Sequence, residues 1–127
     1  MFAHGSSVAS ANDAVRNVTR EVTAQGAFAL AETAFLEGGQ PDLPEAVRRL
    51  VARGATQILV VPYFLTLGIH LQRDLPQIIE GILANYPHLD IQVTEPLDGH
   101  PALARIVVER ASKAIECYLT KYLTVQS

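Results

Sequence analysis

Two histidines and a glutamate stand where three predicted strands of one sheet end. His4 follows the short apolar segment at the N-terminus, Glu37 closes the apolar segment 27–36, and His70 follows the apolar run 58–61 and a loop. Because the carboxyl ends of adjacent parallel strands meet at one edge of a sheet, we expect these side chains to converge on one cleft. Two imidazoles and a carboxylate suit a divalent first-row metal, and three or fewer protein ligands leave coordination positions open.

Each of these residues has a simpler interpretation when it is taken alone. A histidine after a strand is more often hydrogen-bonded to the loop backbone, and a glutamate at a strand end is usually solvated. The joint placement of His4, Glu37 and His70 at one edge favours the metal site, because three independent coincidences are less common than one.

Ser6 and Ser7 follow His4 closely, at the expected start of the first helix, where they could contact an oxyanion or a phosphate. A serine nucleophile is disfavoured because the sequence has no G-x-S-x-G elbow. The loop also has one glycine, which is too few for a P-loop or a dinucleotide-binding turn.

The residues around His70 are unusually apolar for a loop. They are Pro62, Tyr63, Phe64, Leu65, Leu67, Ile69 and Leu71. This loop either packs on a partner subunit or lines a slot for a flat, largely apolar ligand. Arg73 could bind a carboxylate of that ligand with its planar guanidinium, or it could be an ordinary surface residue.

Strands and helices alternate along the whole chain. The predicted strands are 1–3, 27–36, 57–61 and 90–94, and the predicted helices are 9–25, 43–53, 75–85 and 102–122. This order predicts an α/β fold: one three-layer α/β/α domain over residues 1–127, with a four-stranded, mainly parallel sheet and helices on both faces.

Local signals predict where the elements begin and end. The expected helix N-caps are Ser10 or Asn12, Asp42 and Asp74, with Pro44 and Pro76 in the first turns, and the expected helix ends are Gly26 and Gly54. Pro62 is expected to end the third strand because it has no N–H to donate. Gly68 is expected to turn the backbone where other residues would be strained.

The bulk properties exclude several classes of protein. The net charge is -3 and Lys and Arg do not cluster, which argues against nucleic acid or an anionic membrane as the main partner. The single cysteine, Cys117, excludes an internal disulfide and a multi-cysteine metal site. We find neither a signal peptide nor an apolar run of about 18–20 residues, so we expect a cytoplasmic protein.

Five motifs, taken together, resemble a known family. They are A-H-G-S-S (3–7), A-F-L-E (34–37), P-x-L-x-E-A (41–46), V-V-P-Y-F-L-T-L-G-I-H-L-Q-R-D-L-P (60–76) and P-L-x-G-H-P (96–101). In this order they resemble the small sirohydrochlorin chelatases, the CbiX/SirB-like group of class II chelatases. The G-x-H-x-x-x-D-x-P fragment is the most specific of them.

The resemblance implies insertion of a divalent metal, cobalt first and nickel or iron as alternatives, into sirohydrochlorin, an acidic reduced tetrapyrrole of cobalamin and sirohaem synthesis. No organic cofactor is expected. Short members of this family are homodimers, each chain like half of a longer two-lobed chelatase.

The residues that match the family's metal and catalytic histidines are His4 and His70, and Glu37 matches a carboxylate of some relatives. These imidazoles would hold the metal and accept protons that leave the pyrrole nitrogens. Ser6, Phe64, Leu65 and Arg73 are the residues expected to contact the tetrapyrrole. Ser7 stands where the family often has arginine, which is a departure in the part that binds tetrapyrrole carboxylates.

Two other interpretations remain at this point. One is a carrier with the same fold, which binds the tetrapyrrole or the metal but does not catalyse metal insertion. The other is an α/β domain that uses the loop 64–71 only for dimer contacts.

Overall fold

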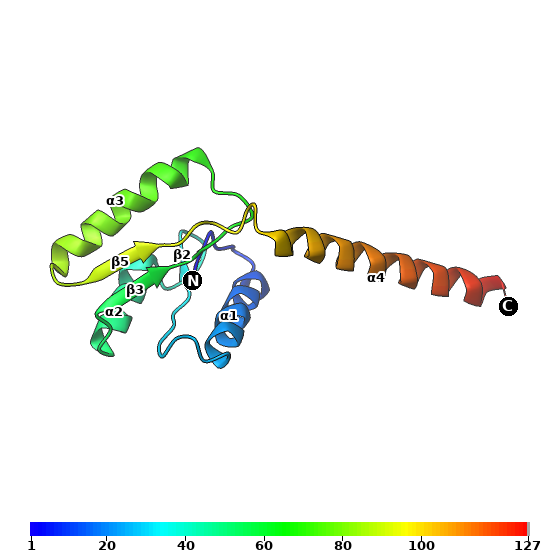
Figure 1. Ribbon diagram of the computed structural model, residues 1–127, viewed down its shortest axis with the longest axis horizontal. Helices are drawn as coiled ribbons and strands as arrows, with labels where there is room; N and C mark the ends of the chain where they lie inside the picture. Colours follow the sequence, from blue (N-terminus) through cyan, green and yellow to red (C-terminus); the bar gives the residue numbers. More distant parts are fainter. Residues whose placement is uncertain (127) are drawn as a thin grey trace. The chain divides into compact units, whose positions relative to one another are not determined.

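The computed structural model describes residues 1–126, which form two compact units, Met1–Pro96 and the part of the chain from Leu97 onwards. The first unit contains every strand, and the second contains one long helix (Figure 1). We describe the two units separately.

All strand pairs of the first unit are parallel. Strand β1 (Phe2–Ala3) pairs with β2 (Ala34–Phe35) on one side and with β4 (Pro62–Tyr63) on the other. Strand β3 (Gln57–Val60) pairs with β5 (Asp90–Val93). The strands form a three-stranded sheet in the order β2, β1, β4 and a two-stranded sheet of β3 and β5, in place of the predicted single four-stranded sheet. Only Val61 separates β3 from β4 along the chain. The prediction of an α/β fold with a parallel sheet is confirmed.

The second strand is much shorter than the predicted 27–36. Strand β1 offers Phe2 and Ala3 for pairing, and these face Ala34 and Phe35. Before this register, the Met1 amine donates to the Glu32 carbonyl at 2.8 Å. Phe28, expected in that strand, is exposed instead.

Strand β3 and its pairing with β5 end at Val60, ahead of Pro62 as predicted, but Pro62 does not end the pairing of this chain segment. It opens β4, lies opposite Phe2 and is fully buried. The pairing does not need an N–H from Pro62, because the Phe2 N–H donates to the carbonyl of Val61 at 2.9 Å.

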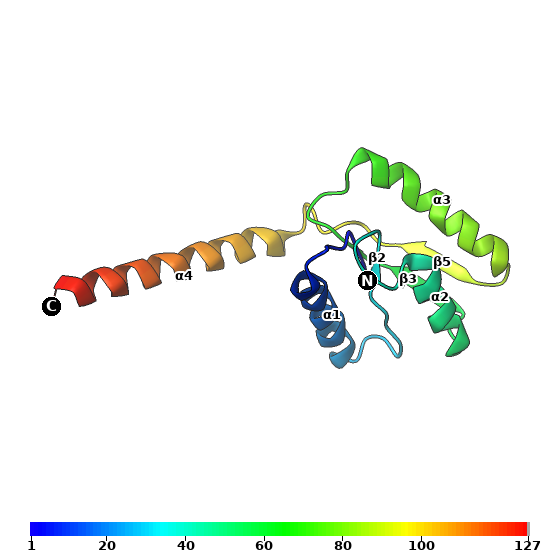
Figure 2. The same cartoon turned by 180° about the vertical axis from the view of Figure 1, so that it is seen from behind.

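Three helices cover the strands of the first unit: α1 (Ala9–Ala24), α2 (Leu43–Ala52) and α3 (Ile69–Asn85). In Figures 1 and 2, α1 and α3 lie on opposite sides of the strands. Helices α2 and α3 share one apolar core with the strands, made of Phe2, Ala34, Leu43, Ala46, Val47, Ile58, Val60, Leu71, Leu75, Ile79 and Ile82.

The cap of α2 was predicted correctly. The Asp42 carboxylate accepts a hydrogen bond from the Glu45 N–H at 3.0 Å, and Pro44 lies in the first turn. Gly26 and Gly54 follow α1 and α2 at φ angles of +79° and +97°, as expected for residues that end helices.

The start of α3 was predicted wrongly. The helix begins at Ile69 with Gly68 as its N-cap, so Asp74 and Pro76 lie inside it. The physical reason is burial: Leu71 and Leu75 precede Pro76 and both pack into the core, which extends the helix towards its N-terminus. Gly68 has an ordinary φ of -64°, so it does not relieve backbone strain.

The start of α1 also differs from the prediction. Its N-cap is Val8, which makes no side-chain cap, and neither Ser10 nor Asn12 caps the helix. The two buried side chains of α1 are the polar residues Asn12 and Thr19. Their hydrogen bonds join α1 to the chain segments that flank β1 and β2.

The second unit contains helix α4 (Pro101–Gln126), which is longer than predicted. No residue of α4 within the described chain is buried. Its exposed large apolar residues are Ile106, Val107, Val108, Ile115, Tyr118, Leu119, Tyr122, Leu123 and Val125. Across residues 1–126 we find no helix with the length and apolar character that crossing a membrane requires.

Candidate active site

The carboxyl ends of β1 and β2 bring His4 and Glu37 together. The register places the two chain segments side by side: the Leu36 N–H donates to the Ala3 carbonyl at 2.8 Å, and the Glu37 N–H donates to the His4 carbonyl at 2.9 Å. The His4 Nε2 then lies 3.2 Å from the Glu37 Oε1. Both side chains are open to solvent, with 59% and 69% of their surface exposed.

Oxygen atoms face both ring nitrogens of His4. Its Nδ1 lies 3.2 Å from the carbonyl of Gly5, while Nε2 faces Glu37. A neutral imidazole has one N–H and can therefore donate to only one of these oxygens, whereas a protonated ring can donate to both. The pair can therefore hold a proton, and the free lone pair of a neutral ring can bind a metal.

The two loops that carry His4 and Glu37 lie in close contact at two glycines. Gly5 has a φ of +89°, and a Cβ atom there would lie 1.7 Å from the Glu37 carbonyl oxygen. Gly38 has a φ of +67°, and a Cβ atom there would lie 3.0 Å from the Ser6 backbone nitrogen. Only glycine combines these backbone angles with this close approach.

Asn12 joins the same loops from α1. Its Oδ1 accepts a hydrogen bond from the Ser6 N–H at 2.9 Å, and its Nδ2 donates to the carbonyls of Ser6 at 2.8 Å and Gly38 at 3.0 Å. From the sequence alone, Asn12 is predicted only as a possible helix N-cap. A buried asparagine near the start of an amphipathic helix could have indicated such a role, since a buried amide needs partners.

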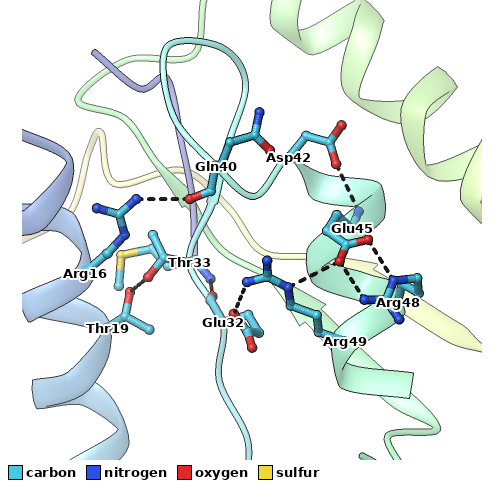
Figure 3. Close-up of polar contacts among 10 residues, drawn as sticks. Arg16, Thr19, Glu32, Thr33, Gln40, Asp42, Glu45, Arg48 and Arg49 are labelled. Atoms are coloured by element: carbon cyan, nitrogen blue, oxygen red, sulfur yellow. Dashed lines mark hydrogen bonds and ion pairs between the residues drawn. The ribbon is translucent and has the colours of Figure 1, made fainter. Parts of the chain in front are cut away.

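Further polar contacts fix α1 against the chain around β2 (Figure 3). The Arg16 guanidinium donates to the Gln40 carbonyl at 3.0 Å and lies 5.0 Å from the centre of the Phe35 ring. The Thr33 hydroxyl donates to the buried Thr19 hydroxyl at 2.7 Å. Helix α1 therefore contacts the chain on both sides of β2: Arg16 reaches the segment after the strand, where Glu37 lies, and Thr19 bonds Thr33 just before the strand.

His70 lies in the exposed first turn of α3 rather than in a loop. Arg73, one turn further on, pairs with its neighbour Asp74 at 3.5 Å between Nε and Oδ1, and both side chains are largely exposed. The apolar surface beside His70 includes Ile69, which is 81% exposed.

The predicted contact residues Phe64 and Leu65 have different surroundings. The Phe64 ring packs edge-on against Phe2, with ring centres 6.1 Å apart, and joins the core. Leu65 is 70% exposed and is free to contact a ligand. The Ser6 hydroxyl already accepts a hydrogen bond from the Val8 N–H at 3.0 Å, so only its remaining donor and acceptor capacity can serve a ligand.

Of the three predicted metal ligands, the structure brings His4 and Glu37 together. Within residues 1–126, no three His, Cys, Asp or Glu side chains are grouped so that they could hold a metal ion. His70 belongs to the same unit but does not complete such a group. The three-residue metal site stays a prediction.

The CbiX family model matches residues 1–114. The chain belongs to the CbiX family. The resemblance seen in the five sequence motifs is thereby confirmed, and the match includes the elements that carry His4, Glu37 and His70.

Two similar proteins are named sirohydrochlorin cobaltochelatase. The protein from Sulfolobus acidocaldarius is 32% identical over 94% of this chain and 93% of the relative. The protein from Methanopyrus kandleri is 28% identical over 91% of this chain and 94% of the relative. Both matches therefore span nearly the full length of each partner.

Two solved structures share the fold. A CbiX protein of cobalamin (vitamin B12) biosynthesis from Marinobacter aquaeolei has a TM-score of 0.78 and 30% identity, over 91% of this chain and 93% of that one. SirB from Bacillus subtilis subspecies spizizenii, in complex with cobalt, has a TM-score of 0.82 and 27% identity, over 88% of this chain. The match covers only 48% of the SirB chain.

Proposed function

We propose that this protein is a sirohydrochlorin chelatase, an enzyme that inserts a divalent metal into the tetrapyrrole, with cobalt as its first metal. The observation that carries this proposal is membership of the CbiX family over residues 1–114, together with full-length relatives that are named cobaltochelatases. Structures of SirB with cobalt and with Fe³⁺ support the metal as the second substrate. Nickel and iron remain the alternative metals.

His4 and Glu37 act as a pair in this proposal. When a divalent metal enters the ring, two pyrrole N–H protons must leave, and a neutral imidazole is a suitable acceptor at neutral pH. The Glu37 Oε1 lies 3.2 Å from the His4 Nε2, within hydrogen-bond reach of a proton on that nitrogen. Both side chains are exposed, so a planar macrocycle and an aquated metal can reach them.

His70 is proposed as the second catalytic histidine and metal ligand. Its place in the exposed first turn of α3 leaves the imidazole accessible from solvent. A three-residue metal site with His4 and Glu37 requires His70 to approach them when the substrates bind. We propose this approach as part of the catalytic cycle.

The tetrapyrrole is proposed to contact Ser6, Phe64, Leu65 and Arg73. Sirohydrochlorin is acidic, and the guanidinium of Arg73 is exposed and can exchange its neighbour Asp74 for a carboxylate of the ligand. Leu65 supplies exposed apolar surface for the face of the macrocycle, while Phe64 anchors its loop to the core.

A second copy of this chain is proposed to complete the enzyme. The match to SirB covers 88% of this chain but 48% of SirB, so one SirB chain has the length of about two such chains. Helix α4 exposes a long set of apolar side chains, and the first unit exposes Leu59 and Val93 on its strands. Burial of such surfaces between two copies would stabilise a homodimer. We also propose that residues 1–127 of each copy form a single domain in this homodimer.

The proposed setting is the cytoplasm. Cys117 is an exposed free thiol, which is typical of a reducing compartment.

An anaerobic insertion assay tests the proposed function. Sirohydrochlorin is mixed with the protein and with Co²⁺, Ni²⁺ or Fe²⁺ in turn, and the absorbance change of the tetrapyrrole is followed. Many turnovers per protein with Co²⁺ are expected. A carrier would bind the tetrapyrrole or the metal without accelerating insertion, and that result with all three metals would refute the proposal.

A further inference from the structure

The Asn12 side chain is the one buried amide that contacts both loops of the His4–Glu37 pair within the described residues. Only 6% of the residue is exposed. Its acceptor and donor atoms each bond backbone groups: the Ser6 N–H and carbonyl in the loop after β1, and the Gly38 carbonyl in the loop after β2. A single side chain therefore connects the two strand ends.

These contacts lie next to the site. Ser6 is two residues from His4, and Gly38 directly follows Glu37. The space around the amide is filled, since a Cβ atom at Gly39 would lie 2.9 Å from the Asn12 Nδ2. A small change in the Asn12 side chain would therefore move one loop relative to the other.

The chemistry of the contact specifies an amide. The carboxylate of an aspartate could accept from the Ser6 N–H but could not donate to the carbonyls of Ser6 and Gly38. An alanine would leave three buried backbone groups without this partner. Among residues of this size, only asparagine supplies the acceptor and both donors.

We propose that Asn12 is a positioning residue that sets the distance between His4 and Glu37. The inference rests on the proposed function for its catalytic consequence, but the geometry of the pair can be measured without turnover. Asn12 itself faces the loop backbone and does not act on the substrate.

The test compares Asn12→Ala with Thr19→Val. Thr19 is the other buried polar residue of α1, and its hydroxyl bonds Thr33 and the Val15 carbonyl, not the two loops. Both substitutions should lower the thermal midpoint. Only Asn12→Ala should change the ¹⁵N signals of the His4 ring in the metal-free protein, towards those of Glu37→Gln.

The kinetic arm uses a double-mutant cycle. Asn12→Ala should lower kcat for Co²⁺ insertion about 10- to 100-fold, as expected for a displacement near 1 Å, and should change kcat far less when Glu37 is already glutamine. Thr19→Val should leave kcat within about twofold. If Asn12→Ala does not fold, Asn12→Ser replaces it, because the serine hydroxyl is uncharged and can still donate or accept one hydrogen bond in the buried site.

Two results would overturn the inference. One is a wild-type His4 ring spectrum in the folded variant. The other is an equal loss of kcat in the presence and absence of the Glu37 carboxylate. A wild-type protein that inserts no metal would instead refute the proposed function, and the ring spectra would still decide the role of Asn12.

Discussion

Replacement of Gly5 by alanine should separate the loops that carry His4 and Glu37. The Cβ atom would lie 1.7 Å from the Glu37 carbonyl oxygen, whereas real Cβ contacts are essentially never shorter than 3.0 Å, so the loops must open by about 1.3 Å. The affected atoms are backbone, so no side chain can rotate away to make room. The Nε2–Oε1 contact of 3.2 Å cannot survive such an opening unchanged.

The effect on stability has two parts. Gly5 has a φ of +89°, and the left-handed conformation costs a residue with a Cβ atom about 1–2 kcal/mol. The steric clash adds about 1–3 kcal/mol, as for other overpacked sites. The effect on catalysis should be about 100-fold in kcat, since a misplacement of about 1 Å costs that much.

Gly26→Ala is the matched control. Gly26 has a similar φ of +79°, but a Cβ atom there would meet nothing within 4 Å. The Gly26→Ala variant should therefore lose only the free energy that the left-handed backbone conformation costs, and its rate of metal insertion should be unchanged. Urea unfolding and anaerobic Co²⁺ insertion would be measured for both variants. Equal stability losses, together with an unchanged kcat in Gly5→Ala, would refute the reasoning.

Three further predictions concern His70, Glu45 and α4. His70→Ala should abolish most Co²⁺ insertion with little change in urea unfolding, because the side chain is exposed; insertion at the wild-type rate would remove its role. Hydrogen bonds from Arg48 hold the pKa of the Glu45 carboxyl at about 2. Because this pKa is lowered on folding, the stabilisation by Glu45 is complete above about pH 4.5 and is lost as the pH falls towards 2. Thermal midpoints of the wild type and Glu45→Gln should therefore converge near pH 2, and a constant difference would contradict this. Leu119→Arg in α4 should shift the protein from dimer to monomer in sedimentation experiments, whereas Lys121→Arg should not; a wild-type monomer would refute the dimer.

The sequence by itself determined the elements with strong local signals. The Asp42 carboxylate and Pro44 set the start of α2 through contacts within one helical turn, so no distant residue was needed to predict them. The alternation of strands and helices also predicted parallel pairing, because a crossover helix returns the chain in the same direction. The family motifs were likewise readable, since they are properties of residue order alone.

Tertiary structure decided the features that depend on distant partners. Strand β2 is limited to the two residues whose register matches Phe2 and Ala3, and α3 begins at Ile69 because the core buries Leu71 and Leu75. Asn12 looked like a helix cap until the loops after β1 and β2 supplied its partners.

The site shows the same division. The sequence identified His4 and Glu37 as candidates at strand ends, but only the register of β1 and β2 brings atoms 33 residues apart to 3.2 Å. Residue types and local order fix which chemistry is available. Contacts across the sheet fix distance, because pairing between strands is a property of two chain segments and is specified by neither alone.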